Sequence, residues 1–110
     1  MVEQESFEDL DIRVGEVVEV EDFPEARKPL FKLTIDLGPE LGRKRSGAGV
    51  TGAYREEDLL GRQVVAVVNL PPRRIVGFVS ECLVLGALSH QGEVILLGPD
   101  RPVPNGSKVF

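Results

Sequence analysis

Strict alternation of apolar and polar residues marks the segment that starts at Phe31. The apolar positions are Phe31, Leu33, Ile35 and Leu37, the residues between them are Lys32, Thr34 and Asp36, and Gly38-Pro39 follows. Successive side chains of a β-strand point to opposite faces of a sheet, so a period of two predicts a strand with one buried face. This segment therefore favours folds built around a sheet that covers a core.

Further strands are predicted on both sides of it. Residues 12–20 carry apolar side chains at Ile12, Val14, Val18 and Val20, which predicts a long strand that bends or bulges near Gly15. A weaker strand is predicted over 43–51, and β-branched or apolar runs predict strands over 63–70, 82–88 and 93–97, the last two across a turn at 90–92.

Short helices and loops separate these strands. Ser6, followed three residues later by Asp9, resembles a helix start and predicts one turn over 6–10. The segment 54–61, which ends in Gly61, predicts a second short helix, and 22–29 and 69–81 are predicted loops. An all-β fold results: a five-stranded OB-fold Greek-key barrel with a short helix between its third and fourth strands and short N- and C-terminal extensions. An SH3-like barrel is the competing fold, but it does not naturally place a helix at 54–61.

Length and composition limit the other possibilities. With 110 residues the chain fits one domain, 1–110, with a core over about 11–98 and an extension over about 99–110. The acidic start lacks the pattern of a signal peptide and no apolar run is long enough to cross a bilayer, so we expect a cytoplasmic protein without membrane insertion.

Charge is segregated along the chain. The net charge is −5, but residues 1–25 hold ten of the acidic residues and a single base, Arg13. The remainder therefore carries a net positive charge, which is compatible with a nucleic-acid partner. On the OB-fold plan the bases lie around one surface: Lys32 on strand two, Arg43, Lys44 and Arg45 on strand three, and Arg73 and Arg74 in the loop before strand five.

Two other interpretations of this surface stay open. Strand alternation prevents Arg43, Lys44 and Arg45 from all pointing the same way. These basic residues could also simply be solvated surface charges. Aromatic side chains for base stacking are scarce, and only Phe78, in the loop, is a candidate contact. Recognition of the shape and backbone of a folded RNA is therefore favoured over coating of a single strand.

No catalytic site or metal site is predicted. Cys82 opens an apolar strand and His90 stands beside a turn, so a small core residue and a surface imidazole are the favoured roles. The segment 47–52 lacks the Lys and the spacing of a phosphate-binding loop. We expect no enzyme activity and no cofactor.

Several short segments resemble a known family. They are DIRVG (11–15), FPEA (23–26), Ser46-Gly47, Asn69-Leu70 with Pro72-Arg73, and Ser80 before Leu83 and Leu85. Together they resemble the tRNA-binding domain family, which includes the C-terminal domains of some bacterial methionyl-tRNA synthetases. The resemblance implies an OB-fold whose RNA-binding residues include Ser46, Asn69, Arg73, Arg74, Ser80 and Glu81, in addition to Lys32, Arg43, Lys44 and Arg45.

The segments EVEDFPEARKP and PDRPVPNG resemble the CsaA branch of that family, whose members are described as homodimeric protein-export chaperones. The leading hypothesis is a homodimeric protein that binds tRNA or structured RNA. The alternative is an export-related chaperone that binds unfolded precursor polypeptides, with Phe78 as the peptide-binding candidate. In either case we expect the ends of the chain, through Phe7 or Phe110, to form the dimer.

Overall fold

The computed structural model describes all residues from Met1 to Phe110. In chain order the elements are α1 (Gln4–Glu8), β1 (Ile12–Asp22), β2 (Phe31–Asp36), α2 (Gly38–Leu41), β3 (Arg43–Ala48), α3 (Glu56–Leu59), β4 (Gln63–Val67), β5 (Arg73–Ile75), β6 (Phe78–Ser80), β7 (Leu83–Val84), β8 (Gly86–Leu88) and β9 (Val94–Leu96). None of the three helices is long and apolar enough to cross a membrane.

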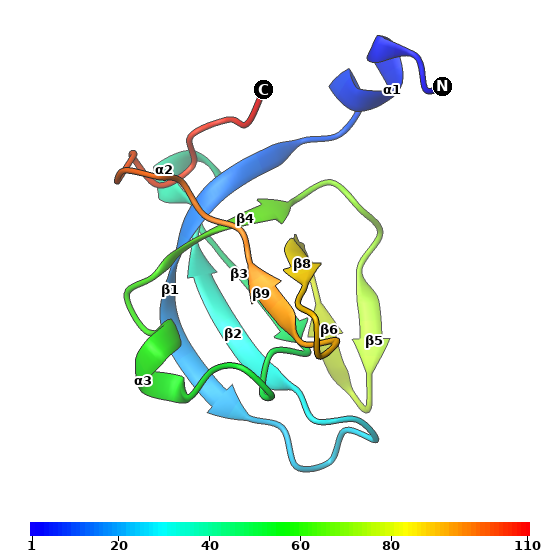
Figure 1. Cartoon of the computed structure of the whole chain (residues 1–110). Helices are drawn as coiled ribbons and strands as arrows, with labels where there is room; N and C mark the ends of the chain where they lie inside the picture. Colours follow the sequence, from blue (N-terminus) through cyan, green and yellow to red (C-terminus); the bar gives the residue numbers. More distant parts are fainter.

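Five strands form one curved antiparallel sheet in the order β3-β2-β1-β4-β7 (Figure 1). The sheet nearly closes on itself because β3 lies against β6 and β7, and the N–H of Glu81 donates to the carbonyl of Arg45 at 2.8 Å. The helix α3 lies between β3 and β4 in the chain. The predicted OB-fold barrel with a helix in this position is confirmed.

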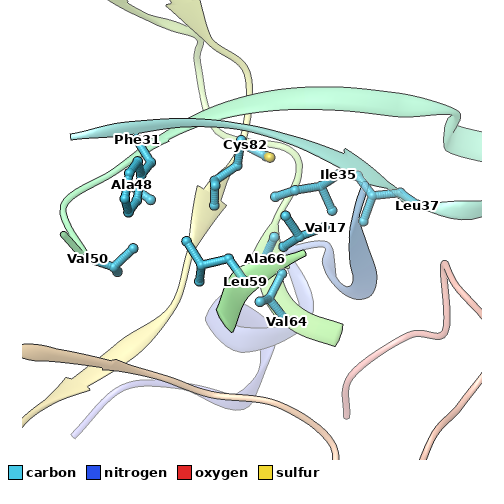
Figure 2. Close-up of a cluster of buried hydrophobic side chains, with 11 residues drawn as sticks. Val17, Phe31, Ile35, Leu37, Ala48, Val50, Leu59, Val64, Ala66 and Cys82 are labelled. Carbon is cyan, nitrogen blue, oxygen red and sulfur yellow. The ribbon is translucent and has the colours of Figure 1, made fainter. Parts of the chain in front are cut away.

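The core lies inside this barrel (Figure 2). Phe31, Leu33, Ile35 and Leu37 are all buried, so the alternation in the sequence identified the inner face of β2 correctly. Leu59, from α3, is fully buried and belongs to the same cluster as Val64 and Ala66 of β4. Cys82 belongs to the same cluster.

The irregularity in β1 lies two residues beyond the predicted position. The pairing of β1 with β2 shifts register between Val17 and Glu19, whereas Gly15 pairs regularly with Val64. Gly15 serves close packing instead, because a Cβ atom there would lie 2.5 Å from the Ile35 side chain. Gly15 and Val17 face the core before the shift, and Val20 packs against the core after it. Val17 is therefore fully buried, and the predicted inward position Val18 is only half-buried.

Other elements also differ from the prediction. The first helix begins at Gln4 without a side-chain cap, so Ser6 does not start it, and α3 is shorter than predicted. The predicted loop 69–81 contains the hairpin β5–β6, and the predicted strand 82–88 is divided into β7 and β8. The predicted turn at 90–92 is confirmed, since β8 pairs with β9 across it.

The C-terminal segment is hydrogen-bonded to the barrel. The N–H of Gly106 donates to the carbonyl of Val14 at 2.7 Å, and the N–H of Val109 donates to the carbonyl of Ile12 at 2.8 Å. The segment thus lies along the first part of β1, whereas α1 extends away from the barrel (Figure 1). The predicted C-terminal extension thus pairs with the backbone of a core strand.

Candidate nucleic-acid interface

The hairpin β5–β6 packs on the outside of the barrel at β3. Gly47 makes this approach possible, because a Cβ atom at this position would lie 3.1 Å from the Cδ1 atom of Ile75 and 3.6 Å from the ring of Phe78. Ile75 and Phe78 are a cross-strand pair, so both point to the same face of the hairpin. That face rests on β3, and the opposite face, with Arg74 and Val79, is exposed.

Two aromatic rings and two cations form a cluster where the hairpin meets the sheet. The rings of Phe23 and Phe78 meet edge to face, with centroids 5.5 Å apart. The Lys32 ammonium lies 4.4 Å from the Phe23 ring centroid, and the Arg45 guanidinium lies 4.8 Å from that of Phe78. Cations placed over ring faces are attracted by the ring quadrupole, so the rings hold both cations at the surface.

Phe78 itself is not an exposed contact. Its side chain is buried, with 8% of its surface exposed, beneath the cations and against Phe23. The sequence-based view of Phe78 as an accessible peptide contact therefore does not fit its burial. Its ring supports the cations instead.

The three consecutive basic residues of β3 are divided between the two faces of the sheet, as strand alternation requires. Arg43 is opposite Asp36 and Arg45 is opposite Thr34, on the outer face, whereas Lys44 is opposite the buried Ile35. Arg43 and Arg45 therefore share a face with Lys32, and Lys44 does not.

Both outer arginines of β3 have carboxylate partners on β1. Arg45 lies 2.9 Å from Glu21 and Arg43 lies 3.9 Å from Glu19. These side chains are between 40% and 60% exposed, so each pair is solvated. Ion pairs of this kind contribute between about 0 and 1 kcal/mol and are readily exchanged for other partners.

Arg73 and Arg74, on β5, are exposed cations without such partners. No carboxylate lies within 4.0 Å of either guanidinium. Arg73 also lines a pocket of about 160 Å³ between the hairpin and the barrel. The other residues that line it are Gly47, Leu70, Pro71, Ser80, Glu81, Cys82 and Leu83.

Three of the predicted site residues make hydrogen bonds that close the barrel. Ser46 is 1% exposed and its hydroxyl donates to the carbonyl of Cys82 at 2.8 Å. The hydroxyl of Ser80 accepts from the N–H of Gly47 at 3.0 Å, and the carboxylate of Glu81 accepts from the N–H of Arg45 at 2.9 Å. The Ser46 side chain therefore lies inside the protein, out of reach of a ligand, while Ser80 and Glu81 also line the pocket.

Asn69 holds the segment that precedes β1. Its Oδ1 atom accepts from the N–H of Asp11 at 2.8 Å and its Nδ2 atom donates to the carbonyl of Asp9 at 2.8 Å. Asn69 therefore positions the chain between α1 and β1. Sequence reasoning did not assign this role, because the partners are about sixty residues apart in the chain.

Sequence reasoning also missed Phe23, Glu19 and Glu21 as members of this surface. Phe23 follows the last residue of β1 and stands outside the alternation, so no periodic signal marks it. The two glutamates belong to the acidic first part of the chain, but the antiparallel pairing of β1, β2 and β3 places them next to the basic residues.

The cysteine is unsuited to catalysis. Burial raises the pKa of the Cys82 thiol to about 11, with a further contribution from the charge of Glu81. The thiol therefore stays protonated at neutral pH, and a protonated thiol is a poor nucleophile. No group of three or more His, Cys, Asp and Glu side chains is placed to hold a metal ion.

Comparison with known proteins assigns the chain to a family. Residues 12–108 match the family model described as "Putative tRNA binding domain". A methionine–tRNA ligase from Methanocaldococcus jannaschii is 44% identical over 102 residues, which cover 93% of this chain but only 15% of that protein. The chain thus spans a small part of this curated relative.

Two solved structures match over the full length of the chain. The chaperone CsaA from Bacillus anthracis is 51% identical, with a TM-score of 0.94 and coverage of 100% of this chain and 99% of that chain. A CsaA chaperone protein from Picrophilus torridus is 45% identical, with a TM-score of 0.94 and full coverage of both chains. By its match to the family model and by its fold, this chain belongs to the tRNA-binding domain family.

Proposed function

We propose that the chain is a non-catalytic module that binds tRNA through the outer face of β2 and β3 together with the hairpin β5–β6. The observation that carries this proposal is the hairpin β5–β6, on which Arg73 and Arg74 are exposed and have no carboxylate within 4.0 Å. Arg73 lines the pocket, and Phe78 of the same hairpin lies beneath the Arg45 guanidinium. Because tRNA is the proposed partner, we expect the protein to act in the cytoplasm.

Lys32, Arg43, Arg45, Arg73 and Arg74 are the proposed phosphate contacts. Arginine and lysine contacts to phosphates supply affinity and fix the register of a protein on its nucleic acid. Ser80 and Glu81 line the pocket, where they can hydrogen-bond a ribose or a base edge. We omit Ser46 and Lys44 from the contact surface because of their positions, and we assign Asn69 to the support of the chain before β1.

The proposed ligand is a folded RNA. Proteins that coat single strands present aromatic side chains on which the bases stack. Here Phe23 and Phe78 are buried beneath cations and present no free ring face of that kind. Contacts to the backbone and shape of a folded RNA fit this surface better.

The dependence of tRNA affinity on salt tests the proposal. Replacement of Arg73 or Arg74 by Ala removes one phosphate contact, so the slope of log affinity against log salt should flatten by about 0.7 to 0.9 for each. Titrations of total tRNA between about 50 and 200 mM salt cover the range in which such contacts lose most of their strength. Arg101→Ala is the matched control, because Arg101 is 90% exposed but lies outside the proposed surface. A wild-type slope near zero, or equal slopes for all variants, would contradict the proposal.

A second function, binding of unfolded polypeptides, is favoured by a separate observation. Leu70, Val76, Val79 and Leu83 are each at least 37% exposed along the hairpin and the pocket, and both full-length structural matches are described as chaperones. Apolar burial is weakly affected by salt, so peptide affinity should change little over the same range. If the protein has this function, Val79→Ser should reduce its affinity for an unfolded export-precursor peptide more than its affinity for tRNA. A peptide affinity unaffected by Val79→Ser would argue against it.

We also propose that the protein forms a homodimer through the end of the molecule that carries α1 and the last residues. Phe7 is 44% exposed and Phe110 is 97% exposed, and both lie near exposed ends of the chain. Because the C-terminal segment pairs with β1, truncation would disturb the barrel, so Phe7→Ser and Phe110→Ser are the better variants. Light scattering should show a dimer for the wild type and the 12.0 kDa monomer for the double variant. A monomeric wild type, or a double variant that stays dimeric, would contradict this interface.

A further inference from the structure

The outer face of the sheet repeats one ion-pair geometry twice. Glu21 lies opposite Lys32, and Glu19 lies opposite Thr34, which in turn lies opposite Arg45. Arg45 nevertheless contacts Glu21, and Arg43 contacts Glu19, so each arginine reaches diagonally across β2 to the glutamate one cross-strand row further along. The same offset in both pairs shows that the outward-facing acidic residues of β1 run alongside the outward-facing basic residues of β3.

This arrangement divides the cations of the proposed RNA surface into two classes. Arg43 and Arg45 each have a carboxylate of the same molecule within 4.0 Å, whereas Arg73 and Arg74 have none. A phosphate can bind the second class directly. To reach the first class it must displace a carboxylate and then stay close to that negative charge.

From this difference we infer that Glu19 and Glu21 are specificity-determining residues that select folded RNA against single-stranded RNA. The inference rests on the proposed function. A flexible single strand that follows the sheet brings phosphates next to both glutamates and meets both repulsions. A folded RNA draws much of its affinity from Arg73 and Arg74, which have no carboxylate within 4.0 Å. Repulsive elements of this kind set specificity because they penalise the wrong partner more than the right one.

Removal of the two charges should therefore raise affinity and lower selectivity. A unit charge a few ångströms from a phosphate in a high-dielectric setting interacts weakly, so Glu19→Gln and Glu21→Gln should each strengthen binding of a polyuridine single strand about threefold, or about tenfold together. The gain for tRNA should be smaller, about two- to threefold for the double variant. The salt dependence of tRNA binding should also become steeper, because no carboxylate is freed to take up a cation.

The control removes the same total charge elsewhere. Glu40 and Glu56 are exposed and form no ion pair, so Glu40→Gln with Glu56→Gln changes the net charge equally without touching this face. Affinities of the wild type and both double variants for tRNA and for polyuridine would be measured at about 50, 100 and 200 mM salt, across the range where phosphate contacts weaken. Circular dichroism would verify that each variant is folded.

The two hypotheses fail in different ways. If the wild type binds tRNA but the Glu19/Glu21 variant gains no more than the control, or gains equally for tRNA and polyuridine, the inference about the glutamates is overturned and the proposed function stands. If the wild type shows no salt-dependent tRNA binding, both are overturned. A larger gain for polyuridine than for tRNA, absent from the control, supports the assignment.

Discussion

Ser46 lies in β3 and is 1% exposed. The residue lies opposite Leu33 on the inner face of the barrel, and its hydroxyl donates to the carbonyl of Cys82 at 2.8 Å. This bond joins β3 to the segment that precedes β7. Ser46→Ala should therefore reduce the stability of the barrel and leave tRNA affinity unchanged.

The size of the effect follows from the geometry. A buried hydrogen bond contributes about 0.5 to 1.5 kcal/mol, and the loss is larger when the remaining partner is left unsatisfied. The Cys82 carbonyl keeps one weak partner, the Ser80 hydroxyl at 3.4 Å, so the penalty is only partly relieved. We expect a loss of about 1 to 2 kcal/mol, which corresponds to a decrease in Tm of about 4 to 8 °C for a domain of this size.

Urea unfolding followed by circular dichroism measures the change in free energy, and a tRNA titration well below the Tm measures binding. Ser107→Ala is a matched control, because its hydroxyl also donates to a backbone carbonyl, that of Pro104 at 2.6 Å, but in an exposed position. The control should stay within about 0.5 kcal/mol of the wild type. A Ser46→Ala protein that keeps its stability but binds tRNA several times more weakly would refute this reasoning.

Three further predictions concern stability. The free energy of unfolding should fall between about pH 9 and pH 11, because the Cys82 thiol keeps its proton to about pH 11 in the folded state and ionises near pH 9 when unfolded. The loss, at most about 2.7 kcal/mol, should be absent from a pH series of Cys82→Ala, and an equal dependence of unfolding free energy on pH in the two proteins would contradict the prediction. Gly106→Ala should destabilise the protein by more than about 2 kcal/mol in urea unfolding, because φ at this residue is +94° and a Cβ atom would lie 2.5 Å from the Leu37 carbonyl oxygen. Gly61→Ala, with φ of +84° and no atom within 4 Å, should show only the backbone strain, and similar losses in both would count against the steric argument. Val76 has a φ of +45° and lies in the exposed tip of the β5–β6 hairpin. Val76→Asn should stabilise the protein by about 1 kcal/mol in thermal unfolding, because Asn tolerates the left-handed region. A loss of stability would mean that the Val76 side chain makes contacts that outweigh the strain.

The sequence alone determined the elements whose pattern is local. The alternation from Phe31 to Leu37 identified β2 and its buried face because a period of two in side-chain direction is a property of a single strand. The order of strands and the position of α3 were sufficient to predict the OB-fold barrel. The segregation of charge along the chain could also be seen without a structure.

Short elements could not be predicted in this way. β5 and β6 have three residues each, too few to show a period, and their hairpin exists because Gly47 leaves room for Ile75 and Phe78 on the outside of β3. The burial of Phe78 follows from that docking. No local pattern around Phe78 distinguishes a ring that supports cations from one that faces a ligand.

Only the tertiary structure decided which charges meet. The sequence places ten of the acidic residues in the first part of the chain, which predicted a net positive charge for the remainder. The antiparallel pairing of β1 and β3 with β2 between them instead sets Glu19 and Glu21 against Arg43 and Arg45. The irregularity between Val17 and Glu19 also reverses which residues of β1 face inward, since a shift of one residue moves every later side chain to the other face. Strand register is fixed by packing between segments distant in the chain, and for that reason the composition of this surface could not be read from the order of its residues.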